Sequence, residues 1–317
     1  MDYVHPIKLI KQLIVVGEKK ASLSVRDMLL RGFLSGVLLG FAAALAFRVS
    51  DGFTGGATAL VMGVIFPVGF VMIVLLGLEL VTGSFALLPM SVADGKISGK
   101  EMLRNWCWVF LGNLLGSLFF AVLLAVALTG TSPAPGGRLT EKIIAVAQAK
   151  TLAYQHASSI GWLAALINGI LCNWMVTLGV VLGLISTSTI GKIIAPWLPI
   201  MTFFALGFEH CVVNMFVIPA AILLGADISV YQWWFWNQVP VTLGNLIGGS
   251  IFTGMLLYAT YGKTHKHELP DAQHENPLAA SLCPICLAPQ SRTPSAQTGA
   301  GTIPRCPSYI SLEDHAR

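Results

Sequence analysis

Long uncharged segments, separated by short polar ones, occupy most of the chain. Four of them far exceed the roughly 18 apolar residues that suggest a membrane-spanning helix, and these cover residues 52–78, 105–137, 151–191 and 228–262. The pattern predicts an all-α membrane protein with six transmembrane helices. The expected spans cover residues 32–47, 56–78, 106–128, 161–185, 197–224 and 240–261.

Two of the expected spans contain a polar interruption at membrane depth. The second is expected to break at residues 80–83 and then resume as a short helix, and the fifth is expected to break at residues 209–214. The fifth interruption contains Glu209, His210 and Asn214. Ionisable groups inside a bilayer are costly and normally face a protein interior or a water-filled path.

Composition and charge divide the chain into three parts. Only 11% of its 317 residues are charged, against about 25% in soluble domains. We predict a basic amphipathic lead-in at residues 1–31, the six-helix membrane domain at residues 32–262 and a disordered polar tail at residues 263–317. Basic residues gather on the side that holds both chain ends. The positive-inside rule therefore predicts a multi-pass protein of the plasma or inner membrane with both termini in the cytoplasm.

The two halves of the expected membrane domain resemble one another. Three matched segments occur in the same order, and they are residues 31–36 with 168–173, 77–79 with 207–209, and 105–116 with 237–248. Three spans is an odd number, so the second copy must enter the membrane from the other side, which makes an inverted repeat. Such folds place their site at mid-membrane, where discontinuous helices of the two halves meet. The alternative is chance similarity, because helix contacts favour small residues.

The polar groups near the two breaks suit a small monovalent anion or its conjugate acid. A broken helix leaves backbone N–H groups that only protein or water can satisfy, and its positive end attracts anions. Thr82 adds a hydroxyl, and His210 adds a group that titrates near neutral pH. The alternatives are that His210 is a packing histidine and that the Thr82 hydroxyl bonds its own helix.

Other residues near the breaks are expected to act beside the pathway. We interpret Glu79 and Glu209 as structural, because two negative charges in the pathway would repel an anion. Asn113 and Asn245 are expected to tie helices together. Large apolar side chains can form constrictions that reject a bare ion far more than a neutral molecule, although core packing is the default role for such residues. The constriction candidates are Phe66, Phe70, Leu80, Val81 and Phe203.

Five motifs in a fixed order carry a specific resemblance. They are Gly77-Leu78-Glu79-Leu80-Val81-Thr82-Gly83, Asn105-Trp106 with Gly112-Asn113, Ile170-Leu171-Cys172-Asn173-Trp174, Gly207-Phe208-Glu209-His210 with Asn214-Met215-Phe216, and Pro240-Val241-Thr242-Leu243-Gly244-Asn245. In these motifs the chain resembles the formate/nitrite transporter family, over about residues 8–262. The resemblance implies an aquaporin-like six-helix protomer in a homopentamer, with one pore per protomer.

The resemblance also implies roles for individual residues. His210 matches the central pore histidine and Thr82 its partner threonine, while Val81 stands where a phenylalanine is more usual. The family has a lysine in the outer vestibule before the fourth span. Its usual spacing to Asn173 falls on an alanine here, and Lys150 is the nearest lysine, about seven residues away. We expect the substrate pathway to include His210, Thr82, Lys150, Asn173 and Asn214.

We hypothesise a channel for small monovalent anions in which His210 supplies or relays a proton. Nitrite is favoured, because Val81 departs from a standard formate gate, and formate, hydrosulfide or bicarbonate is the alternative. The alternatives from other classes are a neutral-solute channel and a histidine-dependent membrane enzyme or haem protein. The expected partners are protons, lipid and further copies of the chain. Neither a cofactor, a metal site nor a nucleic-acid partner is predicted.

Overall fold

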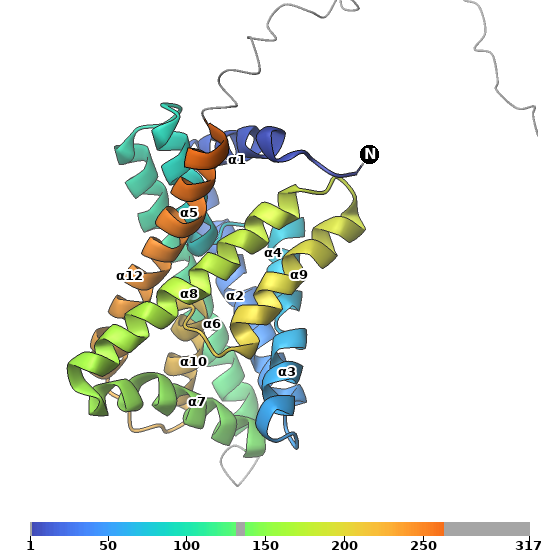
Figure 1. Cartoon of the computed structure of the whole chain (residues 1–317). Helices are drawn as coiled ribbons and strands as arrows, with labels where there is room; N and C mark the ends of the chain where they lie inside the picture. Colours follow the sequence, from blue (N-terminus) through green and yellow to red (C-terminus); the bar gives the residue numbers. More distant parts are fainter. Residues whose placement is uncertain (1, 131–136, 263–317) are drawn as a thin grey trace, which may run out of the picture. The chain divides into compact units, whose positions relative to one another are not determined.

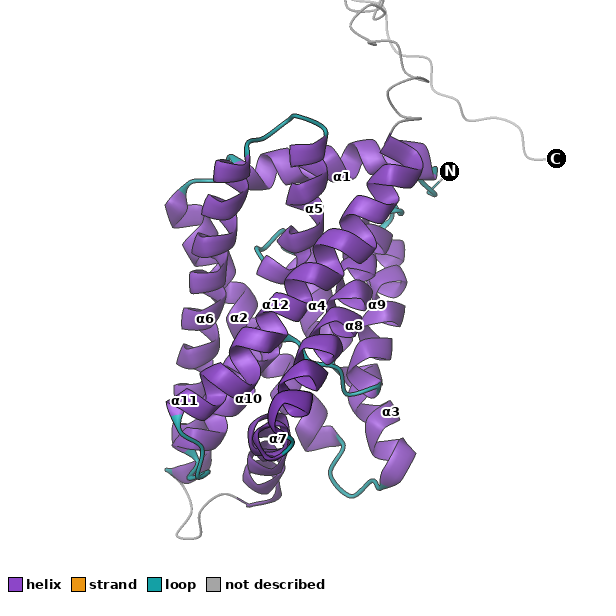
Figure 2. Cartoon of the chain, turned by 60° about the vertical axis from the view of Figure 1, so that its left-hand side comes forward, coloured by secondary structure: helices purple, strands orange, loops and turns teal. Residues whose placement is uncertain are grey.

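The computed structural model describes residues 2–130 and 137–262, and these residues belong to one compact unit. The predicted tail lies outside the described residues. The described part is helical, as the hydrophobic pattern predicts (Figures 1 and 2). Its elements are α1 (Pro6–Ala21), α2 (Val25–Val49), α3 (Gly55–Ile65), α4 (Pro67–Leu75), α5 (Val81–Ala93), α6 (Gly99–Thr129), α7 (Gly137–His156), α8 (Ser158–Leu184), α9 (Thr189–Ala205), α10 (Cys211–Leu223), α11 (Val230–Trp233), α12 (Val239–Ile247) and the π-helical segments η1 (Trp234–Gln238), η2 (Gly248–Met255) and η3 (Tyr258–Gly262).

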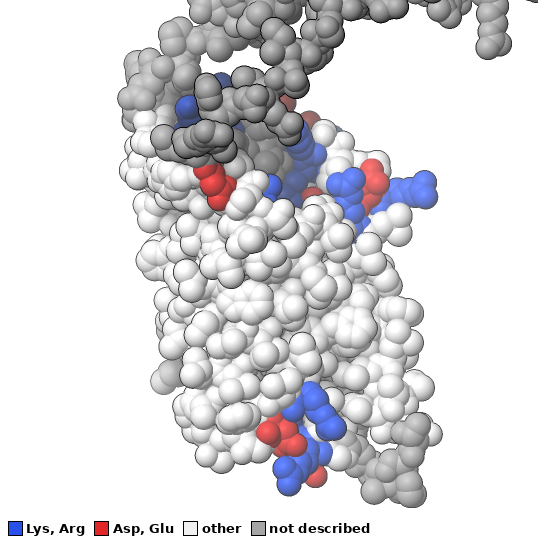
Figure 3. Space-filling view, turned by 90° about the vertical axis from the view of Figure 1, so that its right-hand side faces the viewer, with Lys and Arg blue, Asp and Glu red and all other residues white. Residues whose placement is uncertain are grey.

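The described helices include several that can cross a membrane. Five continuous helical stretches are long and apolar enough, and they cover Val25–Val49, Gly55–Leu75, Gly99–Thr129, Ser158–Leu184 and Val230–Gly262. Three shorter apolar helices, α5, α9 and α10, accompany them. On the face shown in Figure 3, the coloured charged residues lie towards the two ends, with an uncharged belt between them. This distribution fits the multi-pass membrane protein that the sequence predicts.

The two expected breaks are present, but each begins earlier than predicted. Helix α4 ends at Leu75 and α5 begins at Val81, whereas α9 ends at Ala205 and α10 begins at Cys211. Gly77 and Gly207 lie in the breaks with φ of 61° and 73°, a conformation that few residues other than glycine adopt. Thr82 and Asn214 therefore lie in the first turns of α5 and α10. The prediction followed the polar residues, while the backbone leaves the helix near each glycine.

Helix α7 was not predicted from the sequence. The sequence pattern predicts a loop at residues 129–158, between the third and fourth expected spans, yet the structure has a 20-residue helix at Gly137–His156. Its buried positions Thr140, Ile143, Ala147 and Thr151 follow helical spacing but include two hydroxyl residues, so the apolar period is weak. Helices α1 and α7 lie at opposite ends of the bundle (Figures 1 and 2).

Two close helix pairs, α2 with α6 and α8 with α12, hold the bundle together at glycines. A Cβ added to Gly112 would lie 3.1 Å from the Cα of Gly32, and one added to Gly244 would lie 3.0 Å from the Cα of Gly169. Any side chain at these points would push the paired helices apart. The glycines occupy matching positions of the two sequence repeats.

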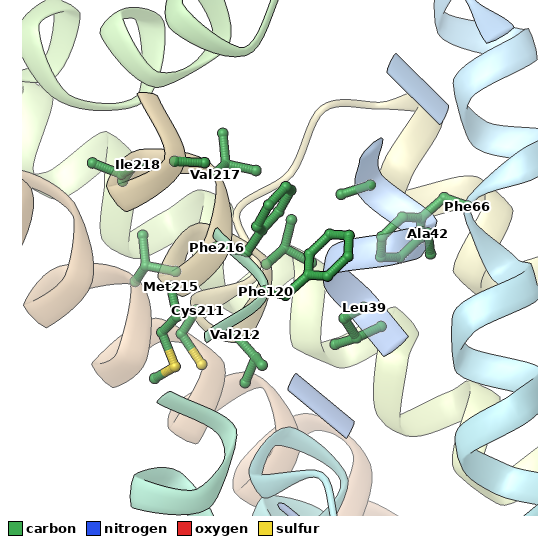
Figure 4. Packing of buried hydrophobic residues seen from close by; sticks show 14 of the residues in the cluster. Leu39, Ala42, Phe66, Phe120, Cys211, Val212, Met215, Phe216, Val217 and Ile218 are labelled. Carbon is green, nitrogen blue, oxygen red and sulfur yellow. The ribbon is translucent and has the colours of Figure 1, made fainter. Parts of the chain in front are cut away.

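The short helices α5 and α10 lie inside the bundle. In α10, the residues from Cys211 to Ala221 are all buried. Figure 4 shows the side chains of Phe216 and Phe120 close together, with Leu39 beside them, and the rings of Phe120 and Phe216 have centroids 5.2 Å apart. This packing holds α10 in the core of the bundle, directly after His210.

Candidate functional site

The starts of α5 and α10 meet through a histidine and a threonine. Thr82 Oγ1 lies 3.1 Å from His210 Nε2, and both side chains are buried. The Val213 N–H donates to His210 Nδ1 at 3.3 Å, so His210 is the N-cap of α10. An Nδ1 that accepts this bond has no proton, and Nε2 therefore carries the proton of the neutral ring. The sequence expected these two residues to act together, and the structure places them in hydrogen-bond contact.

A buried asparagine holds the start of each short helix. Asn113 Oδ1 accepts from the Val81 N–H at 3.0 Å, and its Nδ2 donates to Gly32 O at 2.8 Å and Glu79 O at 2.9 Å. Asn245 makes the same set of bonds in the other half. Its Oδ1 accepts from the Cys211 N–H at 2.9 Å, and its Nδ2 donates to Gly169 O at 2.8 Å and Glu209 O at 2.9 Å. Each amide thus satisfies two backbone groups of its break, an N–H and a carbonyl. Its third bond goes to a carbonyl inside a continuous helix, α2 for Asn113 and α8 for Asn245.

A lysine and a glutamate form an ion pair beside each break. Lys20 Nζ lies 2.8 Å from Glu79 Oε1, and Lys150 Nζ lies 2.9 Å from Glu209 Oε2. Both carboxylate side chains are almost fully buried, with 4% and 3% of their surface exposed. A buried carboxylate requires a paired charge, and each lysine supplies one next to a helix end.

The two carboxylates differ in how completely they are satisfied. Glu209 also accepts from the Tyr154 hydroxyl at 3.1 Å and from Asn214 Nδ2 at 2.7 Å, and Asn237 Nδ2 lies 3.3 Å away. By contrast, Glu79 Oε2 is buried and accepts no hydrogen bond from the described residues. Glu209 is therefore held by more hydrogen-bond partners than Glu79.

Two cavities approach the histidine region from opposite ends. The α1-side cavity, of about 310 Å³, is lined by Lys20, Glu79, Phe70 and Leu80 among others. The α7-side cavity, of about 320 Å³, is lined by the Lys150–Glu209 pair together with Phe203, His210 and Asn214. The two cavities have no lining residue in common. Each one ends at large apolar side chains, and the ring of Phe203 stacks against His210 with centroids 5.8 Å apart.

Comparison with known proteins identifies this arrangement. The family model described as "Formate/nitrite transporter" matches residues 8–259. The chain belongs to the formate/nitrite transporter family. This is a family of membrane channels, so the membrane-enzyme alternative is excluded.

Individual family members agree with this assignment. A probable formate transporter of Methanothermobacter thermautotrophicus is 38% identical over 279 residues, which cover 83% of this chain and 98% of that protein. A solved FNT family ion channel superposes with a TM-score of 0.71 at 27% identity, covering 80% of this chain and 98% of the other. A structure titled "Pentameric formate channel with formate bound" gives a TM-score of 0.62 at 30% identity, covering 75% and 97%.

Within this formate/nitrite transporter, not all residues predicted for the pathway lie on the two cavities. Phe66 stacks on Phe204 with ring centroids 3.9 Å apart, and it lines neither cavity. Val81 is fully buried and also lines neither. Asn173 Nδ2 donates to Thr82 O at 3.1 Å and to Asn245 O at 2.6 Å. Asn173 therefore links α8 to α5 and α12, whereas Lys150 and Asn214 do line the α7-side cavity.

Lys20, Tyr154 and Asn237 belong to the site but were not among the predicted site residues. The internal repeat contained a signal for Lys20, because Lys20 and Lys150 are separated by the same number of residues as Glu79 and Glu209. The backbone carbonyls of the two lysines also accept equivalent hydrogen bonds. Asn105 Nδ2 donates to Lys20 O at 2.9 Å, and Asn237 Nδ2 donates to Lys150 O at 2.9 Å.

Proposed function

We propose that this protein is a formate channel. The observation that carries the proposal is the meeting of two helix starts at Thr82 and His210, between two cavities that each contain a lysine. The named relatives favour formate over nitrite, since one is a probable formate transporter and another holds formate. The argument for nitrite depended only on the presence of Val81 where a phenylalanine is more usual.

The paired contacts support an inverted repeat of two three-helix halves. The Lys–Glu pairs, the clamping asparagines and the helix-contact glycines each occur once in each half. In this interpretation the protomer has six spans and an aquaporin-like plan, with the second span formed by α3, α4 and α5 and the fifth by α9 and α10. The solved pentameric relative supports a homopentamer with a pathway in each protomer. We place α1 on the cytoplasmic side, following the positive-inside rule.

The proposed pathway runs through both cavities and the apolar layer between them. Formate is drawn into the α7-side cavity by Lys150 and into the α1-side cavity by Lys20, while the helix starts add partial positive charge. Phe70 and Leu80 on one side and Phe203 on the other make the layer costly for a charged species. The layer therefore favours passage of neutral formic acid.

The geometry refines the role that the sequence suggested for His210. In the neutral ring, Nε2–H can donate to the carbonyl oxygen of formic acid, while the hydroxyl oxygen of Thr82 can accept the O–H of the acid. The proton then crosses on formic acid itself, after formate takes it up from water in one cavity, and it returns to water in the other. If His210 gave up its Nε2 proton, its Nδ1 could take up another proton only after the hydrogen bond from the Val213 N–H to Nδ1 had broken.

Competing fluxes in one preparation test the choice of anion. Purified protein is reconstituted in liposomes, and formate and nitrite uptake are measured separately and in competition. The proposal expects formate uptake well above that of protein-free liposomes, and slower uptake of nitrite at equal concentration. Rapid nitrite uptake with formate uptake at the protein-free level would contradict it.

A further inference from the structure

The outer face of α1 carries a groove rich in lysine. The groove has a volume of about 530 Å³, and its walls include Lys8, Lys11 and Lys19 together with Val16 and Leu184. The lysines repeat at helical spacing on the side of α1 opposite to its buried residues, which include Leu9 and Leu13. We call this feature the α1 groove.

The α1 groove leads into the α1-side cavity. Three residues, Val16, Lys19 and Leu184, line both hollows. Lys20 follows Lys19 in the chain and lines only the inner cavity, where it pairs with Glu79. A single helix therefore carries lysines that line the outer groove and, on its inner side, the lysine of the ion pair beside the break.

The charge in this approach is unbalanced. The residues that line the α1 groove include three lysines and no carboxylate, and none of the three forms an ion pair with a described residue. The neighbouring acid on α1, Glu18, is exposed and is not part of the groove lining. In the inner cavity Lys19, Lys20 and Arg31 face the single carboxylate of Glu79.

At the opposite end of the bundle, the approach to the cavity has equal numbers of positive and negative residues. A hollow of about 360 Å³ shares Phe47 with the α7-side cavity, and it is lined by two cations and two carboxylates. These are Arg138, Lys142, Asp51 and Glu141. Arg138 lies 3.6 Å from Asp51. The approach from the α7 end is thus electrically balanced, and the approach from the α1 end is strongly cationic.

We propose that the α1 groove is a capture site for the permeating anion, which it loads into the α1-side cavity. The proposal rests on the proposed anion channel and adds Lys8, Lys11 and Lys19 to its pathway. In water, a monovalent anion about 7 Å from three ammonium groups would be enriched roughly 20-fold without screening, and roughly threefold to fivefold at physiological ionic strength. Because the groove lies outside the central apolar layer, capture there raises the local anion concentration without changing the crossing step. It should therefore lower the formate concentration that half-saturates the channel and leave the limiting flux unchanged.

The test compares two double variants in sided membrane vesicles. K8Q/K11Q removes two charges from the groove, whereas K96Q/K100Q removes two charges in and just after the α5–α6 loop, outside the residues that line the groove. Glu18→Cys, in a separate sample whose six native cysteines are replaced by serine, is probed with an impermeant maleimide and reports which vesicles expose α1. Formate uptake is measured against formate concentration, with salt varied on one side at a time.

For K8Q/K11Q we expect the half-saturating formate concentration from the α1 face to rise about fivefold at low ionic strength, with the limiting flux unchanged. High salt on the α1 side should produce the same rise in the unmodified protein, and salt on the α7 side should produce none. K96Q/K100Q should behave as the unmodified protein. The proposal is overturned if the half-saturating formate concentration of K8Q/K11Q equals that of the unmodified protein, or if both double variants raise it by the same factor.

Two further arms separate the possible explanations. If the unmodified protein takes up no formate, the formate proposal fails. The same comparison is then made with nitrite uptake, because capture in the groove depends on the charge of the anion and not on its identity. An anionic phospholipid headgroup could also occupy a groove of lysines. To test this, the half-saturating formate concentration of K8Q/K11Q is measured again in vesicles made only of phosphatidylcholine. If it no longer differs from that of the unmodified protein, and mass spectrometry shows that K8Q/K11Q has lost a bound phospholipid, the groove is a lipid site and the proposal is wrong.

Discussion

Replacing Asn245 by alanine tests whether the position of the second break depends on one amide. The side chain is fully buried and satisfies the Cys211 N–H and the carbonyls of Gly169 and Glu209. Leaving a buried backbone group unpaired costs about 1–3 kcal/mol. The Cys211 N–H and the Glu209 carbonyl are two such groups, whereas the Gly169 carbonyl lies inside the continuous helix α8. The loss in the free energy of unfolding is therefore at least about 2 kcal/mol, unless water replaces the amide.

The loss should affect function as well as stability. The Cys211 N–H begins α10, directly after His210, so its release allows the ring to move from Thr82. We expect Asn245→Ala to lower formate flux at least tenfold per folded protomer, because small misplacements at a site carry large penalties. Asn245→Asp retains the acceptor for the Cys211 N–H, so its stability and its formate flux should lie between those of Asn245→Ala and those of the unmodified protein.

The assay pairs denaturant unfolding in detergent with formate uptake in liposomes. Asn113→Ala is the matched variant, since Asn113 makes the equivalent three bonds to the first break. It should destabilise the protein by a similar amount. If Asn245→Ala kept both the stability and the flux of the unmodified protein, the argument that this amide holds the break would be refuted.

Three other changes follow from the same contacts. Glu209→Ala leaves Lys150 without its carboxylate and should cost about 3–5 kcal/mol by denaturant unfolding, whereas an unchanged midpoint would show that water pairs the lysine equally well. Phe203→Ala opens the apolar layer beside His210 and should raise uptake of larger carboxylates such as acetate relative to formate; an unchanged ratio would exclude Phe203 from the constriction. Hydrogen bonds from Ser186 and Ser188 hold the pKa of Asp2 well below its ordinary value, so this contact should persist above about pH 4 and be lost as the pH falls further. Protease cleavage near the start of α1 should therefore be faster in Asp2→Asn than in the unmodified protein at pH 7, and the difference should disappear in strong acid; equal cleavage at pH 7 would argue against this tether.

Much of the architecture could be predicted from the sequence because it depends on long-range patterns. Lengths of uncharged chain predicted the membrane spans, and the polar interruptions at residues 80–83 and 209–214 predicted the existence of both breaks. The pairing of Thr82 with His210 followed from the family resemblance. Each of these signals is carried by residue type and spacing.

The remainder depends on packing that spacing does not encode. The breaks occur near Gly77 and Gly207 because their left-handed backbone ends each helix, whereas the polar residues that follow lie in the next helix. Helix α7 buries hydroxyl side chains such as Thr140, so its sequence looks like a loop. Val81 is apolar and close to the site, but its side chain packs in the core.

The ratio of protons to formate moved tests the central claim most directly. Liposomes containing the protein and a pH-sensitive dye are given an inward formate gradient with the membrane potential clamped at zero. Passage of neutral formic acid between Thr82 and His210 requires one proton for each formate, so the lumen should acidify in step with uptake. Formate uptake without acidification would show that the anion crosses charged, and it would contradict the account.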